Sequence, residues 1–171
     1  MKRFAAALLA CAITAGTACA APDTRIGTVD LQRAVTESKE GAAARADLLK
    51  RTEQANNELK ALLSEADRMR QELEKESAQL SAEARAEKQR QYQKKLRDIQ
   101  NRQREAQEEL KQVEGDSLKK ILAKFGVILE KIGNDNEYAV ILDKSTGVYY
   151  AGKKTDVTPL LVKQADKEYQ R

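Results

Sequence analysis

The chain of 171 residues contains no histidine and no tryptophan, and it has only two prolines and two cysteines. Both cysteines, Cys11 and Cys19, lie within the first twenty residues. The rest of the chain therefore has no thiol nucleophile, no imidazole for acid–base chemistry and none of the common zinc spacings. We expect a protein that is not an enzyme and that needs neither a metal nor a cofactor.

The amino-terminal residues 1–20 have the pattern of a secretory signal peptide. Lys2 and Arg3 precede a short apolar run, and Ala18-Cys19-Ala20 matches an A-x-A cleavage site near Ala20. Lipidation at Cys19 is the alternative, although Gly16 stands where a lipobox prefers leucine. An exported chain without a disulfide must be held by packing or by oligomerisation.

Charge is abundant but nearly balanced. The chain has 31 basic and 27 acidic residues, a formal net charge of +4, and two of the basic residues belong to the expected signal peptide. A charge balance this even argues against nucleic acid as the partner.

A long stretch with almost no proline carries one thin apolar stripe. Apolar or small residues recur in steps of three and four, which is the a/d pattern of a coiled-coil seam. We expect one helix over residues 42–79, starting after a break at Gly41, and a second over residues 82–133. The tip of the hairpin is expected near Leu80 and Ser81. The expected seam positions are Leu48, Thr52, Ala55, Leu59, Leu62, Ala66, Met69, Leu73 and Leu80, followed by Leu96, Ile99, Gln103, Ala106, Leu110 and Val113.

The two ends of the chain carry the patterns of a compact fold. From Leu118 onward the apolar stripe broadens, which indicates a helix entering a core. Expected strands cover residues 25–29, 138–142 and 148–151, Asp30 is expected to cap a short helix, and a last helix is expected over residues 158–169.

The predicted fold class is therefore α+β and mostly α. We expect a small β-containing association body from residues 21–44 and 118–171, with a long antiparallel helical hairpin, or tentacle, from residues 45–117. Because this core is small for such long helices, we expect self-association. A monomer with a small head is the alternative.

Three groups of hairpin residues are candidates for function. Apolar residues of a loosely packed hairpin could contact a partner, and they are Leu59, Leu62, Leu63, Met69, Leu73, Leu80, Tyr92, Leu96 and Ile99. A basic cluster near the tip is either a solvated face or a site for anionic lipid, and it comprises Arg85, Lys88, Arg90, Lys94, Lys95 and Arg97. Gly115, where the thin seam meets the broad stripe, is a candidate hinge.

The chain resembles the Skp/OmpH family of periplasmic chaperones. The resemblance rests on Ile-Gly-Thr-Val-Asp-Leu-Gln at residues 26–32, on the charged hairpin with its tip near Ser81, and on residues 138–143 and 148–158. It implies a periplasmic homotrimer with three tentacles around a cavity. Such a trimer would hold unfolded outer-membrane β-barrel proteins without ATP. The resemblance also implies possible binding of lipopolysaccharide through basic tentacle residues. The alternative is a structural coiled-coil protein that bridges partners in the cell envelope.

Overall fold

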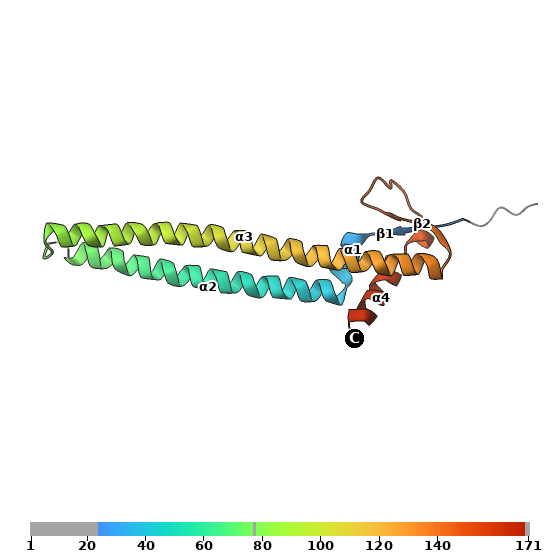
Figure 1. Ribbon diagram of the computed structural model, residues 1–171, viewed down its shortest axis with the longest axis horizontal. Coiled ribbons are helices and arrows are strands. Elements are labelled where there is room, and N and C mark those ends of the chain that lie inside the picture. The colour runs from blue at the N-terminus through green and yellow to red at the C-terminus, as the bar shows by residue number, and fades with distance from the viewer. Residues whose placement is uncertain (1–23, 77, 170–171) are drawn as a thin grey trace, which may run out of the picture.

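A long helical arm stands out from a small body in the computed structural model, which describes residues 24–76 and 78–169 (Figure 1). The expected signal peptide, with Cys19 and the cleavage site near Ala20, lies outside the described residues. The mostly helical α+β fold is confirmed. The elements in order are β1 (Arg25–Val29), α1 (Leu31–Glu37), α2 (Lys39–Glu76), α3 (Ala82–Asp135), β2 (Tyr138–Asp143), the 3-10 helix η1 (Lys153–Thr155) and α4 (Thr158–Tyr169).

The arm is formed by α2 and the first part of α3, which lie side by side. Helix α2 has 38 residues, so it is about 57 Å long at about 1.5 Å per residue. Ser81 caps α3, because its hydroxyl accepts a hydrogen bond of 3.2 Å from the backbone N–H of Ala84. The predicted tip is thus confirmed. The body, at the other end, consists of β1, α1, β2, η1, α4 and the last part of α3.

The break before α2 lies at Ser38, and the prediction that Gly41 breaks the helix was wrong. Ser38 is buried and extended, and its hydroxyl binds both the carbonyl of Val35 and the N–H of Gly41 at 3.1 Å. Gly41 lies inside the first turns of α2. A Cβ there would stand 1.8 Å from the carbonyl oxygen of Val35, so the glycine permits a close backbone approach.

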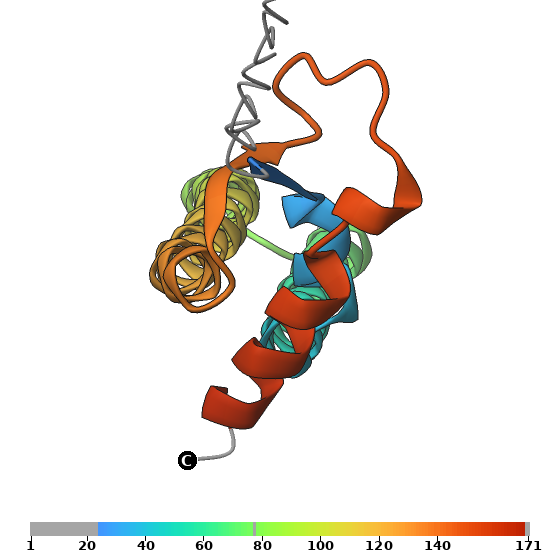
Figure 2. The ribbon, with the colours of Figure 1, turned by 90° about the vertical axis from the view of Figure 1, so that its right-hand side faces the viewer.

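The two strands form a parallel pair, with Ile26 opposite Val140 and Val29 opposite Asp143. The whole arm serves as the connection between them. The prediction of a third strand at residues 148–151 was wrong for the single chain, in which these residues form no strand. This segment belongs to a loop that projects from the body (Figure 2), and within the described residues it makes no backbone hydrogen bond.

The core of the body is built around the last part of α3, as the broad stripe predicted. Phe125 and Leu161 are fully buried, which places α3 against α4. The complete buried cluster is Val29, Ala34, Ile121, Phe125, Ile128, Ile132, Val157, Leu161 and Ala165.

A polar cluster around Asp156 ties the amino-terminal elements to the carboxyl-terminal ones. The Asp156 carboxylate accepts hydrogen bonds from the Arg33 guanidinium at 3.0 Å and from the Thr158 hydroxyl at 2.6 Å, and the Lys144 ammonium lies 3.4 Å from it. The Thr158 hydroxyl in turn accepts from the N–H of Asp30 at 2.9 Å. Burial alone would raise the pKa of Asp156, but the hydrogen bonds from Thr158 and Arg33 outweigh it and lower this pKa from 3.8 to about 2.

Asp156 should make the body sensitive to acid. Because its pKa is lower in the folded state, its stabilisation is present above about pH 4 and is lost as the pH falls towards 2. We expect Asp156→Asn to lower the free energy of unfolding at pH 7 by about 2 kcal/mol and to flatten its decrease between pH 4 and 2. Urea unfolding over this pH range measures both effects. Asp47→Asn, which breaks an exposed pair with Arg51, is the control and should change little.

Gly41 and Gly115 should respond in opposite ways to alanine. Gly41→Ala forces the Val35 carbonyl to move, and we expect a loss of about 2–4 kcal/mol in unfolding free energy. Nothing lies within 4 Å of a Cβ at Gly115, so Gly115→Ala should stabilise by up to about 1 kcal/mol. Thermal and urea unfolding of the two variants test this. Equal stability of Gly41→Ala and the parent chain would contradict the close approach.

Candidate functional site

The seam of the arm gathers most of the predicted apolar candidates. Ile99 is buried, with 7% of its surface exposed. Leu63 is 55% exposed and lies outside the seam. The other candidates are partly buried, Leu80 in the turn at the tip and the rest on the two helices, namely Leu59, Leu62, Met69, Leu73, Tyr92 and Leu96. The seam is therefore only partly closed, and Leu49, at 64% exposure, is an apolar arm residue that the seam pattern did not select.

Helix α3 keeps the predicted seam at Ile99 and Ala106 but departs from it at position 103. Gln103, expected in the seam, is exposed, and the neighbouring Arg102 is partly buried instead. The cause is a bidentate contact across the arm, in which the Arg102 guanidinium donates to the two carboxylate oxygens of Glu58 at 3.0 and 2.9 Å. An intrahelical pair of Asp98 with Arg102, which the i+4 spacing suggests, is not formed.

One flank of the arm carries an ion-pair ladder between α2 and α3. It consists of Glu58 with Arg102, Glu65 with Lys95 at 2.5 Å, and Glu76 with Lys88. Hydrogen bonds from the Arg102 and Lys95 side chains lower the pKa of Glu58 and Glu65, respectively. The rungs connect residues 12 to 44 positions apart in the chain. They therefore fix the register of the two helices.

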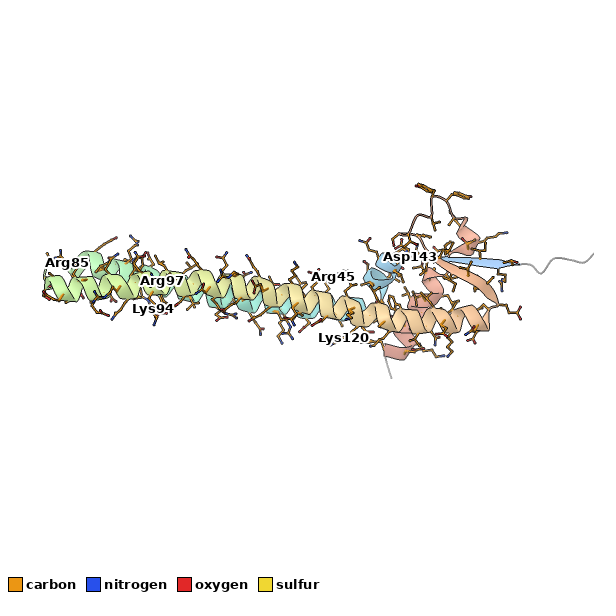
Figure 3. All side chains as sticks on the ribbon, turned by 45° about the horizontal axis from the view of Figure 1, so that its top comes forward. Arg45, Arg85, Lys94, Arg97, Lys120 and Asp143 are labelled. Atoms are coloured by element: carbon orange, nitrogen blue, oxygen red, sulfur yellow. The ribbon has the colours of Figure 1, made fainter. Side chains whose placement is uncertain are left out.

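Several of the basic candidates form ion pairs within the arm. Lys88 and Lys95 belong to the ladder, and Arg90 pairs with Glu87 at 2.6 Å. Lys94 and Arg97 are exposed and form no ion pair with a described residue, and Arg85 lies at the tip end of the arm (Figure 3). Lys88, Lys95 and Arg90 are thus paired with carboxylates of the arm, and a role for the basic cluster stays a prediction.

The root of the arm is loosely packed on one side. A cavity of about 200 Å³ opens between α1, α2 and α3, and its lining includes Leu48, Val113 and Ile121. Gly115 is exposed close to this cavity, in a continuous stretch of α3. Its hinge role stays a prediction.

The body leaves much apolar surface uncovered. Tyr149 and Tyr150, in the projecting loop, are 103% and 88% exposed. Further large apolar side chains of the body that are 40% exposed or more are Ile26, Leu118, Val127, Val140, Leu142, Leu160 and Tyr169.

None of the helices in the described part of the chain has the length and the apolar character that a membrane span requires.

Comparison with known proteins decides the family. A family model described as outer membrane protein (OmpH-like) matches residues 25–164, which include both the arm and the body. The chain belongs to the OmpH-like family. The resemblance to the Skp/OmpH family is therefore confirmed.

One crystal structure from Caulobacter crescentus CB15, described as an OmpH-like outer membrane chaperone, has the same fold as this OmpH-like chain. The TM-score is 0.81, the sequence identity is 21%, and the match covers 85% of each chain. At this identity the likeness concerns the fold. No curated protein sequence matches the chain.

The ladder should control how tightly the arm is closed. Glu65→Lys and Lys95→Glu each place like charges across the seam, so each alone should speed hydrogen exchange of the α2 and α3 amides around these positions. Combining the two restores opposite charges and should restore protection. Protection that is unchanged in both single variants, or lost equally in the double variant, would mean that this rung does not hold the helices together.

Proposed function

We propose that the exported protein is an ATP-independent periplasmic holdase chaperone that binds unfolded outer-membrane β-barrel proteins between its arms and prevents their aggregation. The observation that carries the proposal is the arm itself. It extends far beyond the body and holds leucine, methionine and tyrosine side chains in a seam that is only partly closed. Family membership supports the same role.

The physical needs of such a client match these features. An unfolded barrel strand alternates apolar and polar residues and has unpaired backbone groups, so it aggregates in water. A holdase for many clients needs numerous weak contacts rather than one rigid pocket. Flexible side chains such as Met69 and the partly exposed leucines of the seam can repack around different sequences.

We also propose that the protein is a homotrimer whose three bodies share one core. A two-stranded sheet is marginal by itself, and the body exposes Ile26, Val140 and Leu142 from its strands. The segment of residues 148–151 is extended and has no backbone partner in the described chain. Such a segment can complete a sheet in a neighbouring copy. Three arms projecting from a shared body would enclose a space for the client.

An aggregation assay tests the chaperone proposal. We expect the mature protein, at low micromolar concentration and without ATP, to suppress light scattering when a β-barrel protein is diluted from urea. A structural coiled-coil protein that only bridges envelope partners would leave the scattering unchanged, and that result would refute the holdase.

Native mass measurement tests the assembly. We expect the protein alone to have the mass of three copies, and its complex to have the mass of three copies and one client. Tyr149→Ser combined with Tyr150→Ser should shift the mass towards single chains, because it removes fully exposed aromatic surface from the body. Leu49→Ser on the arm, also an exposed apolar residue, is the control and should keep the parent mass when no client is present. A single chain in the parent protein would contradict the shared core.

We propose that Gly115 lets the arm bend at its root. The helix is continuous there, with open space beside the glycine and the loosely packed cavity nearby. Gly115→Ala should narrow the distribution of arm spread measured by small-angle scattering, since alanine stiffens a helix relative to glycine. An unchanged distribution, both alone and with client, would count against the hinge.

A further inference from the structure

The two flanks of the arm differ in charge. Opposite the ion-pair ladder lies a second flank, which we call the uncharged flank. Over the middle of the arm each helix contributes three uncharged heptad positions to it, Leu49, Asn56 and Leu63 from α2 and Gln93, Gln100 and Gln107 from α3. The next positions of the two series, Arg70 and Glu114, are charged and mark where the flank ends. Successive helical residues are about 100° apart. Residues 56 and 63 therefore lie about 150° around α2 from Glu58, and the seam lies between Glu58 on one side and these two residues on the other. The same rotation on α3 separates Gln100 and Gln107 from Arg102.

All six residues of the uncharged flank are exposed. The two leucines are among the most exposed large apolar side chains of the arm, at 64% and 55%. None of the four amide side chains makes a hydrogen bond to another described residue, whereas Gln71 and Gln91, on other faces, bind carboxylates. These six positions thus offer apolar contacts and unused neutral donors and acceptors, and cations such as Arg97 and Arg104 lie only at their border, about 40° further round α3.

The spacing of the leucines fits an extended chain. Leu49 and Leu63 are fourteen residues apart, which is about 21 Å along a helix at about 1.5 Å per residue. An extended chain covers that distance in about six residues at about 3.4 Å each. Because successive side chains of a strand point to opposite faces, residues six apart lie on the same face, and both leucines would contact that face. In a membrane β-barrel strand of about 9–11 residues, one face is apolar throughout.

We propose that the uncharged flank is the surface on which the arm receives an extended, unfolded polypeptide segment. Leu49 and Leu63 contact its apolar face, and the glutamine and asparagine amides bind its unpaired backbone N–H and C=O groups, because an amide both donates and accepts. Neutral groups suit this task, since a charged side chain would lose water on contact without gaining a counter-charge. The charges needed to close the hairpin lie on the other flank. This inference rests on the proposed holdase function.

Adding charge to the uncharged flank tests the inference without unfolding the arm. In the variant Gln93→Glu, Gln100→Glu, Gln107→Glu, each new carboxylate stands four residues before a cation, namely Arg97, Arg104 or Lys111, an arrangement that supports the helix. The matched control Gln54→Glu, Ser64→Glu, Asn101→Glu adds three carboxylates at exposed positions on other faces, each also three or four residues from a cation.

Anisotropy of a labelled eleven-residue peptide that alternates valine and threonine measures binding to the full assembly. We expect the flank variant to bind about tenfold more weakly or worse, and the control to bind like the parent. Equal weakening of both variants, or of neither, overturns the inference. The aggregation assay separates the two proposals, since a parent that suppresses scattering together with an unaffected flank variant leaves the holdase standing and refutes only this surface.

Photo-crosslinking identifies what occupies the flank. A photoreactive side chain at Asn56 should crosslink to a bound, unfolded barrel protein, whereas the same group at Asn57, about 100° further round α2, should do so at least fivefold less. Crosslinks from Asn56 mainly to a second copy of the chain, or to the lipid of added anionic vesicles, would assign the surface to those partners and overturn the inference.

Discussion

The structure depends on the packing of the last part of α3 into the body. One continuous helix of 54 residues begins at the tip of the arm and ends beneath the strands. Its thin seam pairs with α2, and its broad stripe, centred on Phe125, is buried against Val157 and Leu161. Because the same helix is both arm and core, the packing of the body sets the direction in which the arm leaves it.

Within the arm, polar contacts supply the specificity that the thin apolar seam lacks. Buried alanines such as Ala66 and Ala106 let the helices approach but bury little area. The ladder then fixes the register, since sliding α3 by one turn would break all of its rungs. An arm with these two features holds its shape and still leaves apolar side chains within reach of a partner.

The body has the opposite character. Its core is small, and the polar cluster at Asp156 joins β1, α1 and α4 where few apolar contacts are available. Its outer surface keeps strand residues and two tyrosines open to solvent. A rigid, partly closed arm on an incompletely covered body is a subunit whose remaining apolar surface is suited to association with further copies.

The sequence by itself determined what local interactions control. Periodicities and short-range hydrogen bonds predict the heptad seam, the broad stripe, the caps at Asp30 and Ser81, and the strands at residues 25–29 and 138–142, the second of which extends one residue further in the structure. The tertiary structure decided the rest, because it depends on partners distant in the chain. Arg102 replaced Gln103 in the seam because Glu58 lies across the arm, Gly41 is required by the carbonyl of Val35, and residues 148–151 form no strand because no edge of the described chain pairs with them.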